Sequence, residues 1–153
     1  MKNSYVLDAS VAAKWFLDDE ELVEIARRFL IRFLKREIIF YAPSILKYEI
    51  GHLLTRAYRT GERVTKKECE KAYKIFCTLP IKFYHLTDLQ REKALNFANR
   101  YYRGFYDSCY LILAQEIKCR WLVSEKRYKG ELPKGFPTKY ILTLESIVRP
   151  DKS

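Results

Sequence analysis

Five short segments of the chain are rich in hydrophobic residues and lack a clean alternation with polar ones. They read SYVLDA, IIFYA, IKFYHL, RWLVS and KYILTL, and they begin at Ser4, Ile38, Ile81, Arg120 and Lys139. Strands that are covered on both faces of a sheet have this pattern. We therefore predict four to five strands in a mainly parallel sheet.

Helical patterns lie between these strands. Over residues 18–37, hydrophobic residues recur at helical spacing, with acidic residues first and basic residues last, as the helix dipole favours. Thr65 with Glu68, and Thr87 with Gln90, have the spacing of capping boxes, which predicts that two further helices begin there. Strands that alternate with helices predict an α/β fold.

Length and composition limit the class of protein. The chain has 153 residues, 48% of them hydrophobic, and shows no linker or internal repeat, so we expect a single domain over residues 1–153. The first strand begins too near Met1 to leave room for a signal peptide, and no hydrophobic run is long enough to cross a membrane, which predicts a cytoplasmic protein. The four cysteines lack C-x-x-C spacing and the two histidines are isolated, which argues against zinc, so we interpret the cysteines as buried, reduced thiols.

The chain carries a large excess of positive charge: 29 Lys and Arg against 19 Asp and Glu give a net charge of +10. This balance suits a polyanion such as nucleic acid, although a solubilising surface would have the same composition. Basic residues interleaved with tyrosine, which can stack on unpaired bases, occur around Arg103 and over residues 126–129, where Lys126 and Arg127 are the candidates. Lys14 is a further candidate contact for phosphate.

Four acidic residues have positions that could bring them together. Asp8 directly follows the first predicted strand and Glu125 the fourth, and open parallel sheets form their sites at this carboxyl edge. On a predicted helix, Glu49 lies about 60° from the core residue Leu46. Asp107 shares a helix face with hydrophobic residues four and seven positions later. We expect these four carboxylates to converge at one edge of the sheet.

Each acid also has a purely structural interpretation. Asp8 could cap the following helix, Asp107 could stabilise a helix N-terminus, and Glu49 and Glu125 could pair with neighbouring basic residues. Converging carboxylates, however, repel one another unless a cation compensates them, and oxygen ligands without histidine or cysteine select Mg²⁺ or Mn²⁺. Such an ion can activate water for attack on phosphorus. The chain has no G-x-S-x-G motif and no phosphate-binding glycine loop, which excludes serine hydrolases and P-loop enzymes.

Four segments, VLDASVAAKWFLDDE, YAPSILKYEIGHLL, FYDSCYLILAQ and WLVSEKRY, resemble PIN domains in their order and approximate spacing, and among these the prokaryotic VapC-type toxin ribonucleases. The resemblance extends from Tyr5 to about Leu144. It implies a Rossmann-like three-layer α/β/α fold and cleavage of RNA that depends on Mg²⁺ or Mn²⁺. It also implies a homodimer and inhibition by a small VapB-type antitoxin.

The resemblance assigns roles to individual residues. Asp8, Glu49 and Asp107 match the first three acids of the family. Ser10 matches the small hydroxyl residue two positions after the first acid, and Ser124 matches the Thr or Ser that ends the fourth strand.

The chain departs from the family at the fourth acid. The family usually places one residue between that Thr or Ser and an Asp, whereas here Glu125 follows Ser124 directly. Glu125 could reach the metal directly or through water, or the site could work with three acids. Two alternatives therefore stay open: a catalytically weak PIN module that binds RNA or protein, and a PIN nuclease that acts in RNA processing or on structured DNA outside toxin–antitoxin systems.

Overall fold

The computed structural model describes residues 3–61, 63–125, 128 and 131–147. At its centre lies a five-stranded sheet in which every strand pairing is parallel. The strands are β1 (Ser4–Leu7), β2 (Ile39–Pro43), β3 (Lys82–Tyr84), β4 (Arg120–Val123) and β5 (Ile141–Thr143). The predicted parallel sheet is confirmed, with one strand in each of the five hydrophobic segments.

The order of the strands determines where a site can form. The sheet has the order β3-β2-β1-β4-β5, so the chain adds strands on one side of β1 and later on the other. Its direction of growth therefore reverses between β1 and β4. In open α/β sheets, ligands bind outside the carboxyl ends of the strands at such a reversal. Asp8 and Ser124 directly follow the two strands concerned, and the Asp8 backbone N–H donates to the Leu122 carbonyl at 3.0 Å.

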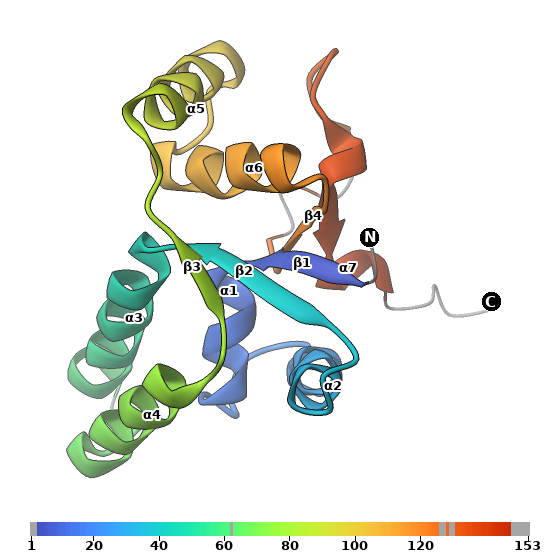
Figure 1. The fold of residues 1–153 in the computed structure, drawn as a ribbon. Helices are drawn as coiled ribbons and strands as arrows, with labels where there is room; N and C mark the ends of the chain where they lie inside the picture. The colour runs from blue at the N-terminus through green and yellow to red at the C-terminus, as the bar shows by residue number, and fades with distance from the viewer. Residues whose placement is uncertain (1–2, 62, 126–127, 129–130, 148–153) are drawn as a thin grey trace, which may run out of the picture.

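Helices cover both faces of the sheet and complete the predicted three-layer α/β/α fold (Figure 1). Helices α1 to α4 follow β1 and β2 and lie on one face, whereas α5 and α6, between β3 and β4, lie on the other. The helices are α1 (Ala9–Ala12), α2 (Val23–Leu34), α3 (Ile45–Gly61), α4 (Lys66–Thr78), α5 (Asp88–Tyr101), α6 (Phe105–Ile117) and α7 (Leu144–Ile147), with short 3-10 turns η1 (Ala13–Trp15) and η3 (Thr138–Tyr140).

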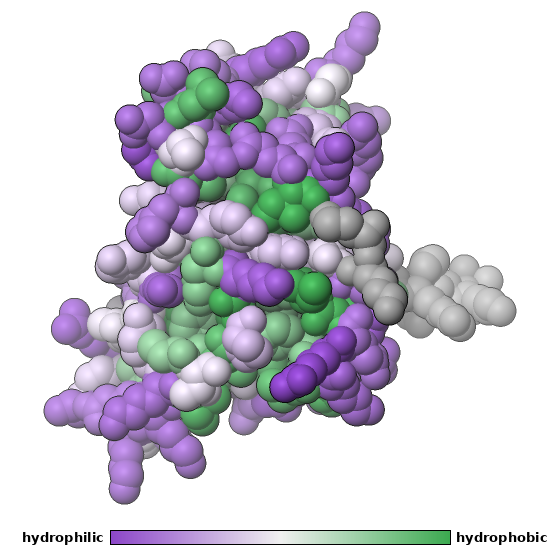
Figure 2. Space-filling model, in the orientation of Figure 1, coloured by the Kyte–Doolittle hydropathy of each residue, from purple (hydrophilic) through white to green (hydrophobic). Residues whose placement is uncertain are grey.

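The core lies between the sheet and its two helical layers. Val6 and Leu122 on neighbouring strands are fully buried, and the middle of α6 is buried from Ser108 to Ala114 because this helix packs on β1, β2 and β4. Hydrophilic side chains cover the ends of the molecule in the view of Figure 2. No helix in the described part of the chain is long and hydrophobic enough to cross a bilayer.

Local signals in the sequence are reproduced in part. Both predicted capping boxes, at Thr65 and at Thr87, are formed. The helix predicted over residues 18–37 begins only at Val23, because Leu22 has a left-handed backbone conformation (φ 60°) that a helix cannot include, and it ends at Leu34. Asp18 and Asp19, before it, form ion pairs with arginines.

The cysteines are not all buried as predicted. Cys109 and Cys119 are buried, but Cys69 is half-buried and Cys77 is exposed. Cys69 and Cys77 both belong to α4, which has only one buried residue, Phe76, because it packs on α3 at the outside of the fold. The prediction of buried thiols is therefore wrong for this helix.

Candidate active site

A pocket of about 580 Å³ opens at the carboxyl edge of the sheet. The ends of β1 and β4, the first half of α3 and the N-terminus of α6 supply its lining. All four predicted acids lie in this lining: Asp8, Glu49, Asp107 and Glu125. We call this the acid pocket.

Asp8 is both a helix cap and a wall of the acid pocket. Its Oδ2 accepts a hydrogen bond from the Ser10 backbone N–H at 2.9 Å, which makes it the N-cap of α1. Its Oδ1 accepts from the indole Nε1–H of Trp121 at 3.0 Å, and only 6% of the residue is exposed. These two donors fix the orientation of the carboxylate. Asp8 therefore caps α1 and lines the acid pocket at the same time.

Glu49 faces the acid pocket from α3, next to the buried residues Leu46 and Ile50. Its Oε2 accepts a hydrogen bond from the Tyr110 hydroxyl at 3.2 Å. Tyr110 is fully buried in α6 and stacks on Trp121, with ring centroids 6.1 Å apart. Each of the two stacked rings thus donates a hydrogen bond to one acid of the pocket, Tyr110 to Glu49 and Trp121 to Asp8.

Asp107 projects from the first turn of α6, where the helix dipole favours an anion. Its Oδ2 accepts a hydrogen bond from the Tyr128 hydroxyl at 2.8 Å. Tyr128 is buried and packs its ring edge-on against Trp121, at 4.9 Å between centroids. Each of these three acids is therefore oriented by an aromatic residue of one cluster, Tyr110, Trp121 and Tyr128.

Ser10 and Ser124 join the ends of β1 and β4. The Ser124 backbone N–H donates to the Ser10 hydroxyl oxygen at 2.9 Å, so the small residue after the first acid holds the end of β4 in place. The Ser124 hydroxyl in turn donates to Glu145 Oε1 at 2.8 Å. Glu125 lies in the pocket lining directly after this junction.

The protonation of two acids reflects their surroundings. Burial raises the pKa of Asp8 from 3.8 to about 6, and the charge of Asp107 adds to this, while hydrogen bonds from Ser10 and Trp121 act against it. Burial likewise raises the pKa of Glu49 from 4.5 to about 7, with further contributions from the charges of Asp8 and Asp107. Carboxylates that share a site without a cation behave in this way.

The donor set fits a hard divalent cation in its chemistry and its charge. The four acids supply carboxylate oxygens, and the raised pKa values of Asp8 and Glu49 indicate that negative charge is held there at a cost that a cation would remove. As the described side chains are arranged, no group of three Asp, Glu, His or Cys residues is close enough to hold one ion. Mg²⁺ usually binds one or two carboxylates and keeps several waters, and the volume of the pocket leaves room for them.

The basic residues predicted to contact RNA behave differently from the acids. Lys14 is buried in η1, with Nζ 3.8 Å from Glu20 Oε2, and does not line the acid pocket, so the expectation that it contacts phosphate is wrong. The Arg103 guanidinium lies over the Tyr128 ring, 5.4 Å from its centroid. Because the Tyr128 hydroxyl donates to Asp107, Arg103 contacts this acid indirectly, through Tyr128. Lys126 and Arg127 lie outside the described residues.

The aromatic residues that orient the acids, and Glu145, were not predicted from the sequence. Glu145 lies two positions after the end of the last strand, β5. The same reasoning that pointed to Asp8 and Glu125, an acid just after a strand, could therefore also have pointed to it. Trp121 and Tyr128 carried no comparable signal, because a buried aromatic residue in a strand or a loop is ordinarily part of the core.

Comparisons with known proteins agree with this geometry. The family model described as PIN domain matches residues 5–129. The crystal structure of the Mycobacterium tuberculosis toxin VapC20, described as a Sarcin-Ricin loop cleaving toxin, is similar in fold, with a TM-score of 0.61 and 14% sequence identity. The match covers 81% of this chain and 91% of that toxin. No curated protein matches the chain in sequence.

Proposed function

Because the chain belongs to the PIN domain family, we propose that it is an endoribonuclease that depends on Mg²⁺ or Mn²⁺ and acts as the toxin of a VapBC-type pair. The observation that carries the proposal is the convergence of Asp8, Glu49, Asp107 and Glu125 in one pocket at the reversal point of the sheet. The similarity in fold to VapC20, a toxin that cleaves the Sarcin-Ricin loop, supports the choice of RNA as substrate and of a VapB-type antitoxin and a second copy of the chain as partners.

In this proposal Asp8 and Asp107 hold the ion, with Glu49 and Glu125 contributing directly or through water. A bound ion would supply polarisation of a phosphoryl oxygen and a lowered pKa for the water molecule that is to attack phosphorus. The residues of the chain supply the orientation. Trp121 and the Ser10 N–H fix the Asp8 carboxylate, and Tyr128 fixes Asp107, so the ligand oxygens are held before substrate arrives.

Single-stranded RNA suits the surface around the acid pocket. Tyr48 and Tyr106 line the pocket, yet 74% and 57% of these residues are exposed, so their rings are available to stack on unpaired bases. The net charge of +10 attracts a polyanion. We keep Arg103 as an RNA contact, together with Lys126 and Arg127.

Cleavage of a fluorescent RNA by the purified protein tests the proposal. We expect cleavage in Mg²⁺ or Mn²⁺, none in EDTA, and a loss of at least about 100-fold in Asp107→Asn, because a metal ligand supplies several kcal/mol to the reaction. Glu92→Gln, which removes an exposed carboxylate of α5, is the matched control and should cleave normally. Cleavage that persists in excess EDTA, or in Asp107→Asn, would refute the assignment.

A catalytically weak module that binds RNA is the second candidate function. The position of Glu125 directly after Ser124 favours it, because the acid is displaced from its usual place in the family. A wild-type protein that binds RNA in EDTA but neither binds Mn²⁺ nor cleaves would support this candidate over the nuclease.

A further inference from the structure

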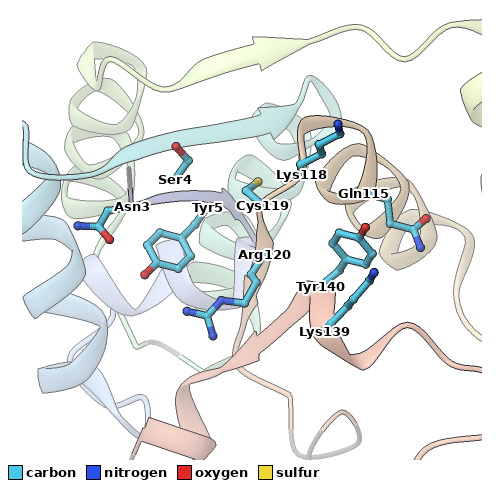
Figure 3. Close-up of a pocket in the computed structure, with 9 residues that line it drawn as sticks. All are labelled: Asn3, Ser4, Tyr5, Gln115, Lys118, Cys119, Arg120, Lys139 and Tyr140. Atoms are coloured by element: carbon cyan, nitrogen blue, oxygen red, sulfur yellow. The ribbon is translucent and has the colours of Figure 1, made fainter. Parts of the chain in front are cut away.

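A second pocket lies at the opposite edge of the sheet from the acid pocket (Figure 3). It has a volume of about 480 Å³, in the range of small-molecule sites. The start of β1, the end of α6 with the turn into β4, and η3 form its walls. We call it the basic pocket and define it by Tyr5, Gln115, Lys118, Arg120, Lys139 and Tyr140.

The basic pocket concentrates positive charge. Lys118, Arg120 and Lys139 come from three different segments, and none of the described residues that line the pocket with them is acidic. Among the described residues, none of the salt bridges involves any of these three cations. Lys118 lies at the C-terminus of α6, where a cation complements the helix dipole. The helix dipole does not explain the positive charges of Arg120, which is on a strand, or of Lys139, which is in η3.

Aromatic side chains hold two of these cations in place of carboxylates. The Arg120 guanidinium lies 5.9 Å from the centroid of the Tyr5 ring, and Lys139 Nζ lies 5.0 Å from that of Tyr140. Contact with a ring face orients a cation and leaves its N–H donors available for a ligand. Figure 3 shows Gln115 beside Lys139 and Tyr140, so an amide adds a further neutral donor.

The floor of the basic pocket does not neutralise its charge. Cys119 lies there between Lys118 and Arg120, and burial raises the pKa of its thiol to about 11. The thiol therefore stays neutral at physiological pH. Within the described lining, no anion balances the three cations.

We propose that the basic pocket binds a phosphate group, either of a free nucleotide or of an RNA segment away from the cleavage point. Arginine and lysine together suit phosphate, because the guanidinium fork binds two of its oxygens and lysine adds a point charge. The bound group is not the scissile phosphate. Asp8 lies three residues after Tyr5, just past the end of β1, so the two pockets lie about 10 Å apart through the sheet and farther along the surface. The inference does not rest on the nuclease assignment, since none of its residues lines the acid pocket.

Titration calorimetry in EDTA tests this proposal with three probes: inorganic phosphate, adenosine 5′-monophosphate and a single-stranded RNA 12-mer. The test protein carries Arg120→Gln with Lys139→Gln. The matched control carries Lys71→Gln with Lys74→Gln, which removes the same charge from exposed positions of α4. We expect the pocket variant to bind at least tenfold more weakly than wild type and the control to bind within twofold of it.

The probes separate the two sources of phosphate. Weaker binding of inorganic phosphate and the nucleotide in the pocket variant alone identifies a free phosphate compound as the ligand. If only RNA shows the difference, the ligand is an RNA backbone, and the salt dependence of RNA affinity should also become shallower. Equal affinities in the pocket variant and the control for all three probes, or no binding by wild type, would overturn the proposal.

Gln115→Glu provides a test that keeps all three cations and so does not depend on the folding of the double variant. It places a carboxylate in the half-buried lining of the basic pocket. We expect it to abolish phosphate binding and to raise the melting temperature, because the new charge takes the place of the ligand. Phosphate affinity equal to that of wild type in the folded Gln115→Glu protein would contradict the proposal.

Discussion

Glu49→Gln is the perturbation that most directly tests the charge balance of the acid pocket. The folded protein binds a proton at Glu49 more tightly than the unfolded chain does, since its pKa rises from 4.5 to about 7. Stability in the absence of metal must therefore fall as pH rises from about 5 to about 8. Gln keeps an oxygen that can accept the Tyr110 hydrogen bond and carries no charge, so it removes the contribution of Glu49 to this dependence without removing the contact, whereas the contribution of Asp8, whose pKa is also raised, remains.

The size of the effect follows from the shift in pKa. A rise of about 2.5 units corresponds to about 3.4 kcal/mol between the ionised and neutral forms, nearly all of which applies at pH 8. Glu49 is only partly buried, and solvent screening reduces the value to about 2 kcal/mol. At pH 5, where Glu49 is largely protonated in the folded protein, the same two pKa values give a destabilisation of less than about 1 kcal/mol. We therefore expect Glu49→Gln to be more stable than wild type by about 2 kcal/mol at pH 8 and nearly equal to it at pH 5.

Urea unfolding in EDTA at the two pH values measures this difference. Asp19, whose pKa is lowered by its hydrogen bond and ion pair with Arg63, loses stabilisation only below this range, so it does not contribute. Glu92→Gln controls for the change in net charge and should behave as wild type at both pH values. Wild-type stability that is constant or rises from pH 5 to pH 8, or a difference between Glu49→Gln and wild type that does not vary with pH, would refute the reasoning.

Three further predictions concern residues around the acid pocket. Tyr128→Phe, which removes the hydrogen bond to Asp107, should weaken Mn²⁺ binding about tenfold in calorimetry, and unchanged Mn²⁺ affinity would show that Tyr128 does not orient the ligand. Tyr106→Ala should weaken binding of single-stranded RNA in EDTA by about fivefold or more, whereas Tyr102→Ala, at a position 94% exposed and outside the pocket, should not; equal losses would argue against stacking at the pocket. Ser10→Ala leaves the Ser124 N–H without its acceptor and should destabilise the fold by about 1–3 kcal/mol in urea unfolding, and a change below about 0.5 kcal/mol would contradict the role of that hydrogen bond.

Much of the fold could be predicted from the sequence because its signals are local. Each strand is a hydrophobic run with its own boundaries, and the capping boxes at Thr65 and Thr87 depend on residues three positions apart. The order of the strands could not be read in this way, because it depends on pairing between distant segments. The start of α2 was misplaced because the left-handed conformation of Leu22 leaves no mark in the hydrophobic pattern, nor does the pairing of Asp19 with Arg63, 44 residues later.

The site divides in the same manner. The positions of Asp8 and Asp107 in the pocket lining could be predicted because a strand end and a helix start are recognisable in the sequence, and both lie at the carboxyl edge of the sheet. Lys14 could not be judged from its spacing to Asp8, since the turn from α1 into η1 carries its side chain into the protein toward Glu20. The hydrogen bond from Trp121 to Asp8 joins residues 113 positions apart, so no local sequence pattern could predict it.

That hydrogen bond also gives the protein an internal optical sensor. The chain has two tryptophans, and Trp15 donates its indole N–H to the Ala26 carbonyl, outside the acid pocket. Trp121 donates to the Asp8 carboxylate and stacks on Tyr110, so we expect its emission to change when an ion or a proton binds at Asp8. Fluorescence of the unlabelled protein should therefore report the state of Asp8, and a Trp15→Phe variant would isolate the signal of Trp121.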